Sequence, residues 1–390
     1  MNVGAAAARQ DQGEAAEVSP SAGDTLARLT VACGVTSNVR LNAPIAVGDR
    51  EVFVDACALQ GSRPYMEDRY GLAQEQSGAP LVIGVFDGHG GFQVAQALAE
   101  SLPLSLLRAL RATGPSEAQV AAAISRCFLE ADAAAVRNDA VHRAPNAPGP
   151  GSTAAVAVLF NNAIWLSNVG DARAVLADDA GVAIAETVDQ TPSVPEERAR
   201  LLMRGATVST NVYDRKPRAC GVLAISRAFG NKGLKQYITA DPAVQRVPLP
   251  RSGCSLLIAS DGLFDVISSA EAVRTLHVRA RAPAATLAVR ARSHKCAMDN
   301  ITAVVVRIGP LPATPEHGGT QQVATQPPER PESVPTQPSQ PAADDTPRPA
   351  AGGAASTAAA GTASAARALS PRTMASKRKL LPSPVASPAA

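Results

Sequence analysis

The sequence predicts an α+β fold in which antiparallel strands alternate with amphipathic helices. Two apolar runs, residues 154–160 and 163–169, are joined by Asn161-Asn162, a pair that tolerates the positive φ angles of a two-residue turn. Gly170-Asp171 then leads into a third apolar run, residues 172–177. Strands with such short connections must be antiparallel, because parallel strands need a crossover of a dozen or more residues. A purely doubly wound parallel sheet is therefore excluded.

Two long helices are expected to cover a sheet. Ser116 can cap a helix whose apolar residues recur at i, i+3 and i+4 spacing from Val120 to Ala131, which gives one buried face. Residues 92–109 predict a second helix, interrupted at Pro103 because proline lacks the backbone N–H that the helix interior needs.

Two shorter helices follow in the second half of the chain. Pro195 suits the first turn of a helix that stops at Gly205. Ser268 with Glu271 three residues later predicts the capping box of the next helix. The proline-rich and glycine-rich residues 142–151 predict a loop.

Composition divides the chain into three parts. Residues 310–390 are rich in Pro, Ala, Ser, Thr and Gln and contain no Phe, Tyr or Trp, so they cannot bury enough apolar surface to offset the entropy of ordering. Residues 1–50 predict a mostly disordered extension, in which the apolar residues 29–32 can pack onto the core. Residues 51–309 are expected to form one folded domain.

Charge and hydropathy exclude several classes of partner. The net charge is +3 and the basic residues are spread out, so no nucleic-acid surface is expected. No run of about twenty apolar residues, signal peptide or N-terminal myristoylation site is found, which predicts an intracellular protein without a membrane partner. The six cysteines show no Cys-x-x-Cys spacing, so neither a zinc site nor a disulfide scaffold is expected. We expect a monomer.

Five acidic residues follow or precede strand-like apolar runs. Four of them are followed directly by Gly, Ala or Asn, so each alone is compatible with an ordinary turn. Turns do not need an acid each time, however, and strand ends that lie side by side would bring these carboxylates together. Like charges at short range need a cation to neutralise them. The acids that predict a metal site are Asp68, Asp87, Asp171, Asp261 and Asp299.

The donor types point to Mg²⁺ or Mn²⁺, because Asp and Glu oxygens favour hard cations. Two such ions could share Asp87 and activate a water for attack on phosphorus. Arg63 stands four residues before Glu67, and its planar guanidinium can hold a phosphate. These residues together favour phosphoester hydrolysis.

Seven motifs across residues 50–309 resemble, in order, those of the metal-dependent serine/threonine phosphatases known as protein phosphatase 2C. The resemblance implies two antiparallel sheets packed as a sandwich and flanked by helices, a four-layer αββα fold. It also implies phosphoserine and phosphothreonine proteins as substrates and two Mg²⁺ or Mn²⁺ ions, with a third ion at a weaker position. The motifs are RPYMEDR from Arg63, VFDGHGG from Val85, GSTA from Gly151, NVGDAR from Asn168, LAISRAFG from Leu223, ASDGLFD from Ala259 and DNIT from Asp299.

The resemblance also implies roles for single residues. Arg63 would bind the substrate phosphate and His89 would protonate the leaving oxygen, which requires a His pKa near the working pH. Asp68, beside Glu67, would orient metal-bound waters from the second shell. The two ions would be held by Glu67, Asp87, the Gly88 carbonyl, Asp261 and Asp299, and the third by Asp171 and Asp265 with Asp261.

Two residues depart from the family pattern. Asn231 stands where the family usually has Asp, and Gln190 where His is common. Residues 189–218 resemble the variable flap beside the site, which is expected to shape substrate choice. Trp165 falls in a predicted hairpin strand rather than in the flap, which argues against the plant hormone co-receptor branch of the family.

Three alternatives remain open from the sequence. Cys57 and Arg63 have the spacing of a cysteine-dependent phosphatase, although residues 52–59 predict a strand instead of the glycine-rich loop that this chemistry needs. A non-catalytic protein could retain the fold and bind a partner. Small phosphate esters, rather than proteins, could be the substrates.

The C-terminal tail carries a basic run, Lys377-Arg378-Lys379, flanked by the Ser-Pro pairs that begin at Ser370, Ser383 and Ser387. This pattern is compatible with nuclear import or docking that phosphorylation controls, and equally with a basic patch of no function. Cytoplasm and nucleus are both open as locations.

Overall fold

The computed structural model describes residues 44–114, 116–138, 148–277 and 281–310, together with the backbone of three short strands nearer the N-terminus. All of them belong to one compact unit, Met1–Gly318. The predicted C-terminal tail beyond Pro310 and residues 142–147 of the predicted loop lie outside the described residues.

The first sheet has eight strands. β5 (Arg50–Leu59) and β19 (Ile301–Ile308) lie at its centre and pair antiparallel, with Leu59 opposite Ile301. All pairs in this sheet are antiparallel except β1 with β3. The remaining strands are β1 (Ala16–Val18), β3 (Thr36–Leu41), β4 (Ile45–Val47), β12 (Arg173–Asp178), β13 (Ala183–Glu186) and β18 (Cys254–Ala259).

The second sheet has six strands, all paired antiparallel, in the order β17-β11-β10-β7-β6-β2. The predicted hairpin is confirmed: Asn161 and Asn162 have φ angles of 50° and 53°, as its two-residue turn requires. The strands are β2 (Arg28–Val31), β6 (Arg69–Gln74), β7 (Leu81–Phe86), β10 (Ala154–Phe160), β11 (Ala163–Val169) and β17 (Ala243–Pro248).

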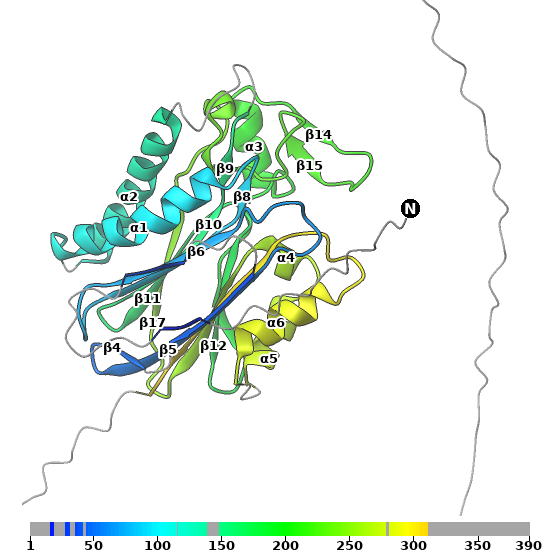
Figure 1. The fold of residues 1–390 in the computed structure, drawn as a ribbon. Helices are drawn as coiled ribbons and strands as arrows, with labels where there is room; N and C mark the ends of the chain where they lie inside the picture. The colour runs from blue at the N-terminus through cyan, green and yellow to red at the C-terminus, as the bar shows by residue number, and fades with distance from the viewer. Residues whose placement is uncertain are drawn as a thin grey trace, which may run out of the picture. The chain divides into compact units, whose positions relative to one another are not determined.

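The two sheets pack face to face with helices outside each, as Figure 1 shows. One apolar core contains inward side chains of both sheets, such as Val54, Ile83 and Leu256. A second core joins β7 and β10 to α1 (Gln93–Arg111) and α2 (Glu117–Arg137). A third joins β5, β18 and β19 to α4 (Asp261–Phe264), α5 (Ser269–His277) and α6 (Pro283–Arg292). The predicted αββα sandwich of an α+β fold is therefore confirmed.

The predicted interruption of the first helix is wrong, because α1 continues through Pro103. Proline removes the N–H that would bond the Ala99 carbonyl. In its place Gly71 of β6 lies against this carbonyl, so closely that a Cβ there would be 2.5 Å from the oxygen. Pro103 is buried together with Leu102 and Leu106 on the face toward the sheet. Burial of that apolar face holds the helix together across the missing hydrogen bond.

The helix ends follow the sequence signals in most cases. Ser116 caps α2 with both hydrogen bonds of a capping box, to and from Gln119. α3 (Pro195–Met203) begins at the predicted proline and is followed by Gly205 at φ 83°. At α5 the Ser268 hydroxyl accepts from the Glu271 N–H at 3.3 Å, while the Glu271 carboxylate pairs with Arg290 on α6.

Two short sheets complete the described part of the fold. β8 (Gly88–His89), β9 (Gly151–Ser152) and β16 (Phe229–Gly230) form one of them, and the 3-10 helix η1 (Lys232–Leu234) follows it. β14 (Val208–Thr210) pairs with β15 (Pro217–Ala219) in a hairpin within the predicted flap. Before residue 51, β2, β3 and β4 pair with β6 and β5, so part of the predicted N-terminal extension belongs to the sheets.

Candidate metal centre

The candidate site lies at one end of the sandwich, where four strands of the two sheets meet. β7 ends at Phe86 directly before Asp87, and β11 ends at Val169 before the Gly170-Asp171 turn. β18 ends just before Asp261, and the antiparallel β19 begins just after Asp299. Antiparallel pairing alternates strand ends with strand starts, so acids from distant parts of the chain meet at this edge.

Three of the predicted acids form a tight group. Asp87, Asp171 and Asp261 each offer a carboxylate oxygen, and these oxygens lie within 4.8 Å of one another. Two of the acids come from the second sheet and the third follows β18 of the first sheet. The group therefore exists only because the sheets are packed together.

Burial and mutual repulsion disturb the titration of this group. Burial, and after it the charges of neighbouring acids, raise the pKa of both Asp87 and Asp261 well above the usual value. Burial and repulsion from Asp189 raise the pKa of Asp171 to about 7. A divalent cation among these oxygens would remove the repulsion, and carboxylates are the donors that Mg²⁺ and Mn²⁺ prefer. The residues present therefore fit the ions that the sequence predicts.

Asp68 lies behind the acidic group and is 1% exposed. Its carboxylate accepts a hydrogen bond of 2.7 Å from the Ser260 hydroxyl, next to Asp261. Burial raises the pKa of Asp68 to about 6, against the hydrogen bond from Ser260. Asp68 is not a member of the group of three acids, and its orienting role stays a prediction.

Glu67 is held in place by backbone contacts from two directions. Its carboxylate accepts from the Gly91 N–H at 2.6 Å, in the turn after the DGHG motif. Its own N–H donates to the Asn300 side chain at 2.8 Å. Gly88 packs against it so closely that a Cβ would lie 2.4 Å from the Glu67 carbonyl oxygen. Glycine is therefore the one residue that fits at position 88.

Arg63 lies at the mouth of the site and pairs with Asp299. The Nη2 group is 2.5 Å from the Asp299 carboxylate, and Nε donates to the Met298 carbonyl at 3.2 Å. The side chains of Arg63 and Asp299 are 48% and 33% exposed. The predicted phosphate-binding residue is thus next to the acids, and Asp299 faces Arg63 instead of joining the group of three.

His89 is held by Asn231 on the short ladder. Its Nε2 lies 2.9 Å from the Asn231 Oδ1, and the Asn231 amide in turn donates to the Gly149 carbonyl at 3.0 Å. The amide oxygen accepts only, so His89 carries its proton on Nε2. Burial lowers the pKa of His89 from its ordinary value, and the hydrogen bond with Asn231 opposes this shift.

Asp265 lies at the flap side of the site. A pocket of about 160 Å³ is shared by Asp171, Asp261 and Asp265, the three residues predicted to hold a third ion. The Lys216 ammonium, from the flap, lies 2.9 Å from the Asp265 carboxylate. A lysine charge is therefore already present where a third cation is predicted.

An ion network fixes the base of the flap. Glu197 on α3 is 6% exposed and pairs with Arg227 at 2.6 Å and with Arg200 at 2.9 Å. The Ser226 hydroxyl donates to the same carboxylate at 2.6 Å. Burial would raise the pKa of Glu197, but the bonds from Arg227, Ser226 and Arg200 outweigh it and lower the pKa to about 2.

Sequence reasoning gave no role to three residues that position the site. Asn300 donates to the Gln60 and Tyr65 carbonyls at 2.7 and 3.0 Å and so fixes the segment that carries Arg63 and Glu67. Asn231 holds His89, and Gln190 accepts from the Gly170 N–H at 2.9 Å beside Asp171. The sequence marked Asn231 and Gln190 by their departure from the family pattern, and Asn300 by its place in the DNIT motif. These were the signals that could have identified them as positioning residues.

The structure argues against the cysteine-dependent alternative. Cys57 is 1% exposed near the end of β5, and its side chain packs in the core under α6. A nucleophilic thiolate needs an electropositive and accessible setting. Arg63 lies instead in the exposed loop that follows the strand.

The described parts of the chain contain no helix that is both long and apolar enough to cross a membrane.

A family model described as protein phosphatase 2C matches residues 53–302. The chain is 35% identical over 276 residues to a probable protein phosphatase 2C 56 of Oryza sativa subsp. japonica, which covers 70% of this chain and 75% of that one. It is also 35% identical over 258 residues to a probable protein phosphatase 2C 76 of Arabidopsis thaliana, covering 64% and 58%.

Solved structures share the fold. The serine-threonine phosphatase 2C of Toxoplasma gondii matches 71% of this chain and 100% of its own, with a TM-score of 0.59 and 23% identity. A sex determining protein of C. elegans matches with a TM-score of 0.55 and 22% identity.

Proposed function

Because the chain belongs to the protein phosphatase 2C family, we propose that it hydrolyses phosphoserine and phosphothreonine in proteins with two Mg²⁺ or Mn²⁺ ions. One observation carries the proposal: Asp87, Asp171 and Asp261 place carboxylate oxygens within 4.8 Å of one another. Such a group is costly to bury without a cation. When bound, the ions would supply a water of lowered pKa and offset charge on the phosphoryl oxygens.

The acids are assigned as ligands of the proposed ions from their positions in the two sheets. Asp87 follows β7 of the second sheet and Asp261 follows β18 of the first. In the proposed centre Asp87 would serve both ions, Glu67 would hold one of them and Asp261 the other. The Gly88 carbonyl and Asp299 would complete the ligands, and Asp299 would first have to leave Arg63. Asp171 joins the inner group as well as the pocket with Asp265. Third-ion binding at that pocket is part of the proposal.

Arg63 and His89 act on the substrate. The guanidinium of Arg63 is half exposed beside the acids, so a phosphate can replace Asp299 as its partner. His89 holds a proton on Nε2 and leaves Nδ1 as its second titrating atom. We assign it the transfer of a proton to the serine or threonine oxygen as that oxygen leaves, a step that needs the imidazolium form with Nδ1 also protonated. Because burial lowers the pKa of His89, this form is less populated than in an exposed histidine, and transfer should be favoured at lower pH. The flap hairpin β14–β15 would contact the protein around the phosphorylated residue.

A phosphopeptide assay tests the proposal. Phosphothreonine and phosphotyrosine peptides, and p-nitrophenyl phosphate as a small ester, are incubated with Mg²⁺, Mn²⁺ or EDTA. We expect turnover of the phosphothreonine peptide that EDTA abolishes and Asp87→Asn lowers by at least a hundredfold. Asp179→Asn, exposed just after the end of β12 that lies away from the acids, is the matched control and should retain activity.

The alternatives predict other results. No turnover by the wild type, with no change in Asp87→Asn, would favour a binding protein that keeps the fold. Equal rates on the small ester and the peptide would favour small phosphate esters.

The location in cytoplasm or nucleus stays a prediction, which imaging of a fluorescent fusion with and without residues 370–390 would test.

A further inference from the structure

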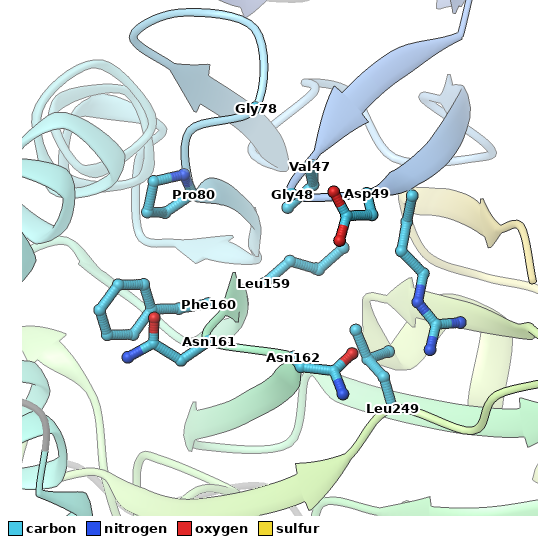
Figure 2. A pocket seen from close by; sticks show the side chains of 11 residues that line it. Val47, Gly48, Asp49, Gly78, Pro80, Leu159, Phe160, Asn161, Asn162 and Leu249 are labelled. Carbon is cyan, nitrogen blue, oxygen red and sulfur yellow. The ribbon is translucent and has the colours of Figure 1, made fainter. Parts of the chain in front are cut away.

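A second and larger pocket lies at the opposite end of the sandwich from the acids (Figure 2). β7 has six residues, with Asp87 after its last one and the pocket residue Pro80 before its first, so the two sites are roughly 20 Å apart at strand geometry. The pocket has a volume of about 520 Å³, within the range of small-molecule sites. It is lined by Val47, Gly48, Asp49, Arg50, Gly78, Pro80, Leu159, Phe160, Asn161, Asn162 and Leu249.

Arg50 in this pocket carries a buried charge that the protein compensates only in part. The residue is 3% exposed, and its Nη1 group donates to the carbonyls of Pro250 and Gly309 at 2.7 and 3.0 Å. Its Nε and Nη2 groups are buried and have no hydrogen-bond partner. Among the described residues no carboxylate forms an ion pair with it. A buried guanidinium without an anion is costly, so an acidic ligand would be bound favourably here.

The other walls define the rest of the ligand. Phe160 is half-buried and Leu249 is 9% exposed, so these two side chains offer apolar surface, with the buried Leu159 beneath them. Asn162 also lines the pocket, and its side-chain amide can donate a hydrogen bond (Figure 2). Asp49 is the one acid among the lining residues and is exposed at the rim. A ligand with one anionic head and a short hydrocarbon body matches both kinds of wall.

The rim is already ordered by backbone hydrogen bonds. Gly48 donates to the Gly78 carbonyl and Gly78 to the Ala46 carbonyl, each at 3.0 Å. Leu249 donates to the Asn162 carbonyl at 3.1 Å. A preformed rim reduces the entropy that a ligand must overcome on binding.

We propose that this pocket binds a small amphipathic anion, with a carboxylate or phosphate head against Arg50 and a hydrocarbon tail against Phe160 and Leu249. The unpaired N–H groups of Arg50 are buried, so binding would require the guanidinium to turn toward the cavity as the head group enters. The binding site is separate from the metal centre and its ligand is not the phosphatase substrate. It gives the fold a second ligand site at the far ends of the same strands.

Calorimetric titration in EDTA tests the proposal without the metal ions. Octanoate and octyl phosphate are the anionic probes, and 1-octanol is the uncharged match. We expect at least one anion to bind one site per chain, at least tenfold more tightly than 1-octanol, and Arg50→Met to lower its affinity at least tenfold. Equal binding of 1-octanol, or unchanged binding by folded Arg50→Met, would overturn the proposal.

Two rim variants with opposite expected signs keep the test decisive if Arg50→Met does not fold. Asp49→Asn removes the nearby acid and should tighten anion binding several-fold. Asn162→Asp keeps the size and the turn geometry but adds a negative charge, so it should weaken binding several-fold. Glu130→Gln, exposed on α2 and with the same charge change as Asp49→Asn, is the control. Equal shifts in Asp49→Asn and Glu130→Gln would show bulk charge alone and refute the site.

The readouts separate this proposal from the proposed function. Anion binding is measured without divalent ions, and turnover of the phosphothreonine peptide is measured with them. Loss of turnover in Asp87→Asn with intact octanoate binding would support both sites independently. Turnover in the wild type with no binding of either anion would refute the second site alone.

Discussion

Replacement of Glu197 by Gln should remove the ion network that fixes α3 to the strand segment before β16. Gln has the shape of a protonated carboxyl group but no charge, so Arg227 and Arg200 would lose their shared acid. The hydroxyl of Ser226 would lose a charged acceptor as well. Breaking a buried pair on one side leaves the other charge uncompensated, which is strongly destabilising.

The size of the effect follows from the titration of Glu197. Its pKa falls from 4.5 to about 2 in the folded protein. A shift of about 2.5 pH units corresponds to about 3 kcal/mol, at 1.36 kcal/mol per unit. A depressed pKa contributes stability that is present above the unfolded value and is lost as pH falls through the folded value. This contribution should therefore be complete at pH 7, and about 2 kcal/mol of it should be lost at pH 3.

Urea unfolding in EDTA at pH 7 and pH 3 measures this contribution. We expect Glu197→Gln to unfold about 3 kcal/mol more easily than the wild type at pH 7, and only about 1 kcal/mol more easily at pH 3. All other acids are common to both proteins and cancel in the difference. Glu196→Gln, one residue away and exposed, is the control and should change stability by less than about 0.5 kcal/mol. The same gap between wild type and Glu197→Gln at both pH values would refute the reasoning.

Three further outcomes concern the metal centre. Asp87→Asn should raise the melting temperature of the EDTA-treated protein at pH 7 by several degrees. A carboxylate whose pKa is raised in the folded protein lowers the stability once the pH exceeds its unfolded pKa, and Asn removes that cost. A lower melting temperature, measured by calorimetry, would contradict this. Arg63→Met should raise KM for a phosphothreonine peptide at least tenfold, since its partner Asp299 cannot bind phosphate; steady-state kinetics with an unchanged KM would count against a phosphate contact. Lys216→Met should tighten the weakest Mn²⁺ binding step several-fold, because it removes the lysine charge beside Asp265, and Asp265→Asn should weaken this step. EPR of free Mn²⁺ measures both. No change in either variant would exclude a third ion beside the flap.

The sequence predicted the elements with local signals. Ser116 and Gln119 cap α2 by a mechanism that depends on neighbouring residues, and Asn161-Asn162 makes its turn for the same reason. Antiparallel order followed from connection length. Pro103 was misjudged because local chemistry predicts a break, while burial of the helix face against Gly71 and the sheet keeps α1 intact.

The ion pairs could not be read from the sequence. Arg63 and Asp299 are far apart in the chain, and their pairing depends on β5 ending at the edge where the antiparallel β19 begins. Lys216 and Asp265 meet because the flap lies beside the C-terminal end of α4. Long-range geometry, rather than residue type, decides which acid finds a basic partner.

The acids near strand ends were identified by sequence alone, together with the hard-cation chemistry that their oxygens imply. Only the tertiary structure decided how they divide. Asp87, Asp171 and Asp261 come together because two sheets pack with their strand ends aligned, whereas Asp299 turns to Arg63. Burial in that shared edge raises their pKa values, and burial is a property of the packed sandwich rather than of any segment. The same packing buries Arg50 at the other end, a charge that its sequence surroundings do not mark.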